Sequence, residues 1–483
     1  MNTIIIKTLK KLNVKNLSIL FFLTLAAVLI IQRTVFAFEY PIPWNDEVAF
    51  IAQAFALSTE NTLFVWGLNQ EQIVMWMPPG YMIMLAAFYK VFGYSFELTR
   101  WISSALYFMS ILTILHIIKY ETKSNIILYS IALLLMLTTF LSPYSLTIAN
   151  IARMESFYFL LFTLSLLFFT KNLPGAALAI VIASATVHYN AIYFLFPASV
   201  FILWCITTNK SITIRSFELL SLCVSALVIL TYLLFVANNL NSFTQDMQFQ
   251  FEWKKIGEVM SGRKGWITLA ALSLIPICIL FISKTFNTSM WLSLYGISFI
   301  AMALNGHNMW YSFAFQTGYM LLAISVIILL NQYKQKKIQT ILIFICIPLI
   351  AQQLNYAWGK HDQFSPMLSL IKSPSQSFLN KEDINKTRKA LHALPSGSSI
   401  SFGYTGVEPF FFNTMYQAGL KWGIPGNSVT QLHPVRSMDY RVHCDSSLFP
   451  KYLFMYDWDG YPRKGEDTGC ALIDLSVKKQ NAK

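Results

Sequence analysis

Charge is scarce in this chain of 483 residues: Asp, Glu, Lys and Arg together make up 12%, whereas 55% of the residues are hydrophobic. Soluble globular domains carry about a quarter charged residues, so the scarcity excludes an ordinary water-soluble enzyme, and the apolar surplus excludes a disordered chain. The formal charge of +13 lies mostly in loops between apolar blocks, which indicates membrane topology and not nucleic-acid binding. We therefore expect an all-α polytopic membrane protein.

Motifs for nucleotide, metal and acyl-transfer chemistry are also missing. The sequence has no GxxxxGK[ST] phosphate loop, no HExxH or CxxC metal spacing and no GxSxG nucleophile turn. ATP-driven transport is therefore not expected, and no cofactor is indicated, although a divalent cation stays open. An energy-rich donor that arrives attached to lipid would need none of these motifs.

What the sequence does have is a series of apolar runs that reach, or nearly reach, the roughly 20 residues of a membrane-spanning helix. About eleven such runs lie at 17–37, 98–118, 126–142, 156–170, 174–187, 191–207, 217–237, 266–283, 288–304, 310–330 and 338–354. They predict a membrane domain over residues 1–354 and a polar C-terminal domain over residues 355–483.

Basic residues between the runs predict the orientation. A cytoplasmic N-terminus satisfies the positive-inside rule in every inner loop. Those loops hold Lys119, Lys123, Lys171, Lys210, Arg215, Lys284, Lys334, Lys336 and Lys337. The protein is then a multi-pass protein of the inner (plasma) membrane with a small extracytoplasmic α+β C-terminal domain, in which strands are expected at Ser399–Tyr404 and Lys451–Met455.

Two cysteines, Cys444 and Cys470, fall in this C-terminal domain. They could form a disulfide in an oxidising compartment, and two isolated thiols are an equal alternative.

The first outer loop, residues 38–98, is the largest. An amphipathic stretch, Val48–Leu57, is followed by an apolar piece, Tyr81–Phe92, that is too short to cross and predicts a helix at the outer interface. Asp46 stands beside Glu47, is the only Asp before position 246, and would lie just above the membrane. It could take a proton from an acceptor hydroxyl or amine while a phosphate leaves, and capping of the next helix is an equal alternative.

Three further groups of residues face the same side in this topology. Arg153 and Glu155 at the mouth of the fourth span could serve a substrate cavity or compensate the helix dipole. His188 and His307 could orient a phosphate, or could be ordinary interfacial histidines. Lys254, Lys255, Arg263 and Lys264 break the positive-inside rule and could hold a phosphodiester or anionic lipid, with a solvated amphipathic helix as the default alternative.

Three motifs carry a resemblance to a known family. Trp44-Asn45-Asp46-Glu47, Met77-Pro78-Pro79-Gly80-Tyr81 and Phe92-Gly93-Tyr94-Ser95-Phe96-Glu97-Leu98-Thr99-Arg100 resemble the GT-C glycosyltransferases. More closely, they resemble the branch of protein O-mannosyltransferases and the lipid A aminoarabinose transferase. The Ser142-Pro143 turn before Arg153-Met154-Glu155 is similar to that branch's second acidic position, and the resemblance covers about residues 1–210.

The resemblance implies transfer of a sugar from a polyprenyl-phosphate donor, undecaprenyl phosphate in a bacterium, to a glycolipid, glycan or protein acceptor at the outer membrane face. It implies inversion at the anomeric carbon, with Asp46 as general base and Glu47 and Glu155 as further catalytic carboxylates. Donor phosphate or substrate would be held by Arg153, Arg100, Tyr81, His188, His307, Lys254, Lys255 and Arg263.

Two positions depart from the branch. It often has Lys or His before the Pro-Pro pair, where this chain has Met77, so its donor phosphate must be held elsewhere. Its second acidic residue is usually Asp, where this chain has Glu155.

Three other classes of membrane protein are expected to have different sequence patterns. An O-antigen polymerase or ligase usually has its large loop between late helices. A lipid or sugar transporter is expected to carry ionisable groups within its spans. In a structural membrane subunit, the only role of Asp46 would be to cap the helix that follows it.

Overall fold

The computed structural model of the protein describes residues 14–35, 45–63, 75, 77–122, 125–211, 213–256, 262–283, 285–304, 309–333, 335–358, 381–402, 408–423, 439–444, 463–468 and 470–474. At the ends of several helices and strands it describes the backbone alone.

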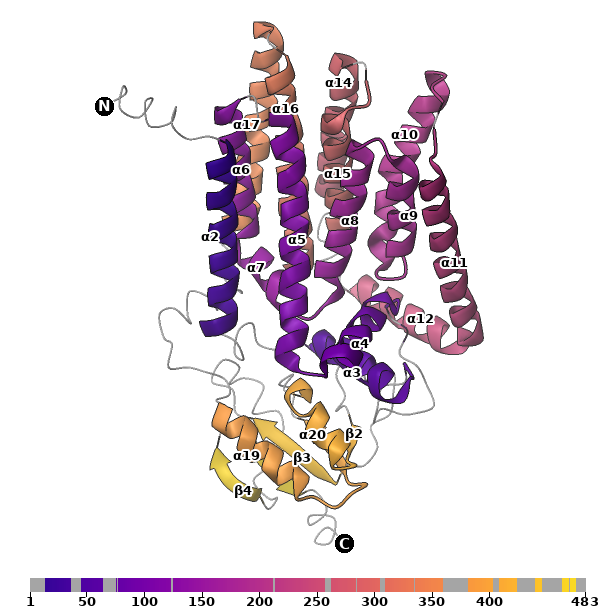
Figure 1. The fold of residues 1–483 in the computed structure, drawn as a ribbon, viewed down its shortest axis with the longest axis vertical. Helices are drawn as coiled ribbons and strands as arrows, with labels where there is room; N and C mark the ends of the chain where they lie inside the picture. Colours follow the sequence, from indigo (N-terminus) through magenta and orange to yellow (C-terminus); the bar gives the residue numbers. More distant parts are fainter. Residues whose placement is uncertain are drawn as a thin grey trace, which may run out of the picture.

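The apolar runs form helices that pack side by side along the longest axis of the molecule (Figure 1). In chain order these helices are α2 (Val14–Val35), α5 (Phe96–Thr122), α6 (Ile126–Phe140), α8 (Met154–Thr170), α9 (Pro174–Ser184), the 3-10 helix η1 (Tyr189–Phe194) with α10 (Leu195–Thr207), α11 (Ser216–Asn238), α13 (Gly262–Leu272) with α14 (Leu274–Ser283), α15 (Thr288–Ala303), α16 (Met309–Gln332) and α17 (Lys336–Trp358). Each of the eleven apolar runs falls on one of these elements or on an adjacent pair. The all-α polytopic class is confirmed.

The helices differ in length and in burial. Six described helices are long and apolar enough to cross a membrane, or up to seven if α6 and α7 (Pro143–Asn150), which meet at 67°, count as one broken span. Shorter apolar helices, α8 and α15 among them, supply many of the buried residues of the bundle. The apolar window of α16 is 89% buried and that of α11 only 6%. Helix α16 is therefore central, and α11 lies at the edge of the bundle, where it packs on α9.

Helices α15 and α16 approach each other through small residues. A Cβ atom on Gly296 would lie 2.8 Å from the carbonyl oxygen of Gly318, and one on Gly318 would lie 2.8 Å from that of Gly296. Such close backbone contact between membrane helices is possible only where side chains are absent or small.

Three helices lie across the direction of the bundle at one end, which we term the capped end (Figure 1): α3 (Asn45–Glu60), α4 (Gly80–Phe92) and α12 (Leu240–Ile256). Helix α3 contains the predicted amphipathic stretch, and α4 matches the predicted interfacial helix. Two segments between apolar runs also contain helices. Helix α12 carries Lys254 and Lys255, where an amphipathic helix was the default alternative. Helix α7, which was not expected, forms after α6 because Ser142 caps it and Pro143 suits its first position.

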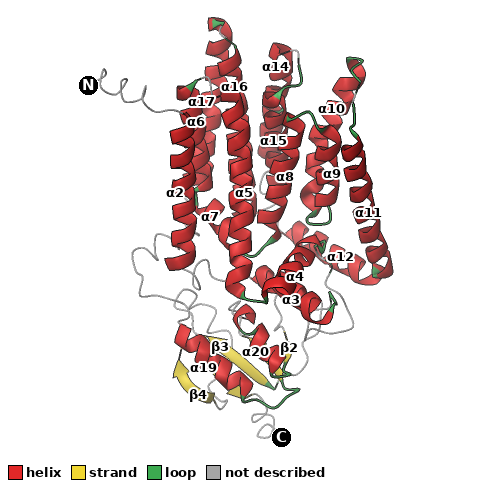
Figure 2. Ribbon diagram, in the orientation of Figure 1, coloured by secondary structure: helices red, strands yellow, loops and turns green. Residues whose placement is uncertain are grey.

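The C-terminal domain lies beyond the capped end and holds all the described strands (Figure 2). Its sheet has the order β2-β1-β3-β5-β4, in which β1 is parallel to β2 and β3, and β5 is antiparallel to β3 and β4. The elements are α19 (Lys381–His392), β1 (Ser399–Phe402), the 3-10 helix η2 (Glu408–Phe410), α20 (Phe412–Gln417), β2 (Lys421–Gly423), β3 (Tyr440–Cys444), β4 (Arg463–Thr468) and β5 (Cys470–Asp474). Strand β1 matches an expected strand, and Lys451–Met455 lie outside the described residues.

Candidate functional site

Asp46 and Glu47 lie in the first turn of α3, at the capped end. The helix begins at Asn45, and Asp46 follows it. The structure describes the backbone of Asp46 alone, whereas the Glu47 side chain is described and fully buried.

Glu47 forms an ion pair with Arg100, one turn into α5. The Arg100 Nε donates to Glu47 Oε1 at 3.0 Å and the Arg100 Nη2 donates to Glu47 Oε2 at 2.9 Å, with both side chains 0% exposed. The backbone N–H of Ala152 also donates to Glu47 Oε1, at 2.7 Å. Two parallel bonds fix the carboxylate's orientation as well as its position. Glu47 thus joins α3 to α5 and to the turn before α8.

Arg153 and Glu155 form a second pair beside this turn. Arg153 is the N-cap residue of α8, and its Nε and Nη2 lie 3.1 and 2.9 Å from the two carboxylate oxygens of Glu155. The Arg153 Cζ lies 5.8 Å from the ring centroid of Phe50, which is on α3. Both charged side chains are almost completely buried, so an incoming anion would meet them in a desolvated setting.

Tyr81 lies close to both pairs. It is fully buried on α4, its hydroxyl lies 3.3 Å from Ser103 Oγ on α5, and its ring meets that of Phe50 edge to face at 6.2 Å. Burial raises the pKa of Tyr81 well above its ordinary value, and the Tyr89 phenol and the Glu47 and Glu155 carboxylates raise it further. The phenol therefore stays protonated at neutral pH and can donate a hydrogen bond.

The turn between α9 and η1 joins the site through Gly80. The Gly80 N–H donates to the carbonyl of Thr186 at 2.7 Å, and a Cβ at Gly80 would lie 2.6 Å from that oxygen. The Pro-Pro-Gly motif is thus packed directly on this turn. His188 follows in the same turn, accepts the Asn190 N–H on Nδ1 at 3.0 Å and meets the ring of Tyr158 at 5.1 Å.

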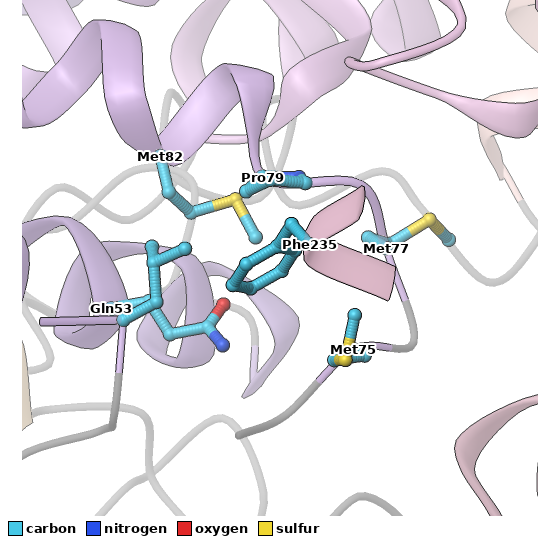
Figure 3. A pocket seen from close by; sticks show the side chains of 7 residues that line it. Gln53, Met75, Met77, Pro79, Met82 and Phe235 are labelled. Atoms are coloured by element: carbon cyan, nitrogen blue, oxygen red, sulfur yellow. The ribbon is translucent and has the colours of Figure 1, made fainter. Parts of the chain in front are cut away.

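A small, mostly apolar hollow lies beside α3 and α4 (Figure 3). Position 53, which contributes Gln53 to its lining, is two helical turns beyond position 46 and on the same face of α3. Met75 also lines this hollow, and its backbone N–H donates a hydrogen bond to the carboxylate of Asp246 on α12. Since Met77 is in the lining, no cation precedes the Pro-Pro pair at this hollow. The lining residues are Gln53, Leu63, Met75, Met77, Pro79, Met82 and Phe235.

The structure brings together the predicted site residues Glu47, Arg100, Arg153, Glu155 and Tyr81, with His188 in the adjoining turn. Other predicted residues cannot be placed. The side chains of Lys254 and Lys255 on α12, and of Arg263 and Lys264 on α13, are not described, and His307 lies outside the described residues. No group of three or more His, Cys, Asp or Glu side chains that could hold a metal occurs within the described ranges.

Sequence reasoning missed the partners that organise the site. Ser103, Phe50 and the backbone of Ala152 contact the predicted residues, yet none carries a sequence signal, because each contact joins segments far apart in the chain.

A helical membrane bundle with an interfacial helix and a small α+β C-terminal domain is the architecture that the sequence predicts. The fold is that of ArnT, the lipid A aminoarabinose transferase of the GT-C class. The crystal structure of ArnT from Cupriavidus metallidurans bound to undecaprenyl phosphate superposes with a TM-score of 0.57 at 10% identity, covering 96% of this chain and 99% of that chain. The apo structure of the same protein gives 0.56 at 10% identity, over 95% and 98% of the two chains. No protein-family profile matches the sequence, and no curated protein matches it.

Proposed function

We propose that the protein is a GT-C type membrane glycosyltransferase. Its donor is a sugar linked to a polyprenyl phosphate, here undecaprenyl phosphate, and it moves that sugar to an acceptor at the outer face of the membrane. One observation carries the proposal: the chain shares, over nearly its full length, the fold of ArnT bound to undecaprenyl phosphate. The Asp-Glu pair in the first turn of α3, at the capped end, supplies the carboxylates.

The reaction is a single displacement at the anomeric carbon. The acceptor's hydroxyl or amine forms a bond to that carbon while the bond between the carbon and the phosphate oxygen breaks, and the phosphate leaves with the bonding electrons. Asp46 takes the acceptor's proton as general base. One base and one leaving group on opposite sides of the carbon give inversion of configuration.

The neighbouring carboxylates have supporting roles in this proposal. Glu47 is bound by Arg100 and by the Ala152 N–H, so it holds the first turn of α3 in place. Glu155 balances Arg153 in the absence of donor and supports substrate binding in its presence.

Arg153 is the proposed principal contact of the donor phosphate. Two nitrogens of Arg100 are bound to Glu47 on another helix, whereas Arg153 is paired with Glu155, a carboxylate of its own helix turn that a phosphate could replace. Tyr81 would donate a hydrogen bond in the same region, and His188, with the basic residues of α12 and α13, would complete the set. A desolvated site strengthens each of these contacts to the anion.

The acceptor is a glycolipid, a glycan or a protein. The proposed orientation is an N-terminus in the cytoplasm of the inner membrane and a C-terminal domain on the extracytoplasmic side, since the basic residues of the loops favour it.

The test compares cells that carry wild-type protein, Asp46→Asn or Glu60→Gln at matched membrane levels. Glu60 is an exposed carboxylate at the other end of the same helix, so Glu60→Gln is the matched control. Mass spectrometry of envelope glycolipids and exported glycoproteins should reveal one sugar that is absent with Asp46→Asn and present with Glu60→Gln. The mass difference would then name the sugar class and the acceptor.

A binding measurement separates catalysis from substrate recognition. Undecaprenyl phosphate should raise the melting temperature of purified wild-type protein and of Asp46→Asn alike, because a ligand that binds only the folded state stabilises it. Unchanged glycans with stably inserted Asp46→Asn protein would refute the transferase proposal and favour transport or scaffolding.

A further inference from the structure

The C-terminal domain contacts the membrane domain through aromatic rings at two places. At the first, the ring of Phe410 in η2 meets that of Phe96, the first residue of α5, edge to face at 4.7 Å. At the second, Phe412 and Tyr416 of α20 lie 6.0 and 5.6 Å from the ring of Phe55 on α3. Both contacts lie close to α3, the helix that carries Asp46.

Hydrogen bonds from both domains hold the backbone at Phe410. Its carbonyl oxygen accepts hydrogen bonds from Nε and Nη2 of Arg388 on α19, at 3.2 and 3.0 Å. The hydroxyl of Tyr94, just before α5, donates to the adjacent carbonyl of Pro409. Phe410 is only 4% exposed, so its ring is buried at the boundary of the two domains.

The contact continues from Phe96 into the site. The Arg100 Cζ lies 4.5 Å from the centroid of the Phe96 ring, and the same guanidinium makes the two bonds to Glu47. Arg100 Nη1 is buried and has no hydrogen-bond partner among the described residues. The face of an aromatic ring is then an important stabilising contact for this desolvated cation.

These contacts form an unbroken series from the C-terminal domain to α3: Phe410 on Phe96, Phe96 on Arg100, and Arg100 on Glu47, which is the neighbour of Asp46. We propose that Phe410 is a positioning residue, and that docking of the C-terminal domain through Phe410 sets the position of the first turn of α3 in the transferase reaction. The inference rests on the proposed function for its catalytic consequence. Its structural consequence, a firmly held first turn of α3, can be tested without activity.

The second contact makes the test selective. Because Phe412 and Tyr416 hold the domain to Phe55, loss of the Phe410 ring should leave the domain docked and loosen only the route through Arg100. Phe410→Leu keeps an apolar side chain and removes the ring. Phe402→Leu is the matched control, since Phe402 is also buried, lies in β1, and stacks on Phe411 at 5.6 Å inside the domain.

Hydrogen–deuterium exchange of the full chain in detergent is the first measurement. Amides in the first half of α3 should exchange faster in Phe410→Leu than in wild type, and Phe402→Leu should leave them unchanged. Unchanged exchange in Phe410→Leu, or an equal increase in both variants, would overturn the inference whatever the activity of the protein.

The second measurement is the initial rate at which membranes form the glycan that Asp46→Asn abolishes. Phe410→Leu should lower the maximal rate about threefold to tenfold, the range that one aromatic pair contributes, while its affinity for undecaprenyl phosphate stays that of wild type. Phe96→Leu should do the same, and the double variant should lose little more than either single variant, because both break one series of contacts. A lowered affinity with an unchanged maximal rate, or additive losses, would contradict a positioning role. If wild-type membranes form no glycan, the proposed function fails, and the exchange result still decides this inference.

Discussion

Glu47 and Arg100 form a buried ion pair in which nitrogen–oxygen contacts of 3.0 and 2.9 Å join α3 to α5, with no part of either side chain exposed to solvent. The pair lies between the first helix of the capped end and the start of a long span. It therefore determines where the residue before Glu47, the proposed base Asp46, lies relative to the bundle.

Breaking this pair should destabilise the protein strongly. Glu47→Gln leaves the Arg100 charge buried without its counterion, which costs about 3–5 kcal/mol in comparable pairs. The melting temperature in detergent should fall markedly. The double variant Glu47→Leu/Arg100→Met should melt closer to wild type than either single variant, because it removes both charges.

The control for this prediction is Glu382→Gln in α19. Glu382 pairs with Lys386 at 3.0 Å, but its side chain is 73% exposed, and exposed pairs contribute little to stability. Equal melting temperatures for Glu47→Gln and Glu382→Gln would show that the buried pair is not a stabilising feature.

Gly80→Ala should disturb the contact between α4 and the turn before η1. The added Cβ would lie 2.6 Å from the backbone oxygen of Thr186, so one of the two segments must move. Overpacking of this kind typically costs about 1–3 kcal/mol. Thermal unfolding in detergent should report a lowered melting temperature.

Thr186→Ala provides the comparison for Gly80→Ala. It removes the Thr186 side chain and leaves the carbonyl in place, so it should neither destabilise much alone nor rescue Gly80→Ala. Rescue in the double variant would mean that the side chain, and not the backbone, opposes the added methyl group.

The stability of the capped end should fall at alkaline pH. Burial raises the pKa of the Tyr81 phenol well above its ordinary value of 10.0, so above that pH the unfolded chain loses this proton before the folded protein does. The folded state then binds more protons, and the contribution of Tyr81 to stability is complete below pH 10.0 and declines as the pH rises further.

Tyr81→Phe should therefore reduce the drop in melting temperature between neutral and strongly alkaline buffer. Ser103→Ala, which keeps the phenol and removes its hydrogen-bond partner, should retain the drop. The same alkaline drop in wild type and Tyr81→Phe would refute a role for this phenol.

Cys444 and Cys470 of the C-terminal domain should form a disulfide in the protein as it occurs in cells. The antiparallel ladder of β3 and β5 sets these two residues directly opposite each other. Opposed residues in such ladders have Cα atoms about 4.5–5.5 Å apart, within the range that a disulfide requires. In an oxidising compartment a dithiol oxidase would accept the two electrons, and the two thiols would lose two protons.

Mass spectrometry of unreduced proteolytic fragments should find the two peptides joined. Cys205, Cys223, Cys278 and Cys346, which are free in the structure, should be alkylated without reduction and serve as internal controls. Alkylation of Cys444 and Cys470 in unreduced protein would argue against both the bridge and an extracytoplasmic C-terminal domain.

Much of the fold could be predicted from local sequence patterns. The apolar runs predicted the helices of the bundle, because in a bilayer every backbone polar group must be satisfied within its own segment and apolar length alone identifies such helices. The apolar run at Tyr81–Phe92 is too short to cross a membrane, so it predicted an interfacial helix, which the structure shows as α4. Helix α7 was not predicted, because its formation depends on a cap and a proline over only eight residues.

The contacts within the site could be predicted only in part from such patterns. Scarcity of acidic residues singled out Asp46, Glu47 and Glu155, and the sequence placed Arg153 and Glu155 together at the start of the fourth span, where the structure pairs them. Glu47 and Arg100 were expected to serve catalysis and phosphate binding separately, and the structure pairs them with each other. Position in the sequence could not reveal this, because the two residues come from different helices and meet only when those helices pack.

The sequence by itself therefore determined the class of protein, the membrane helices and the loop that holds Asp46, since hydropathy and charge act locally along the chain. Only the tertiary structure decided which charges neutralise each other, which turn packs on Gly80, and that the ring of Phe410 reaches α5 from the C-terminal domain. Those contacts join segments up to several hundred residues apart, and only packing of the whole chain brings such segments together.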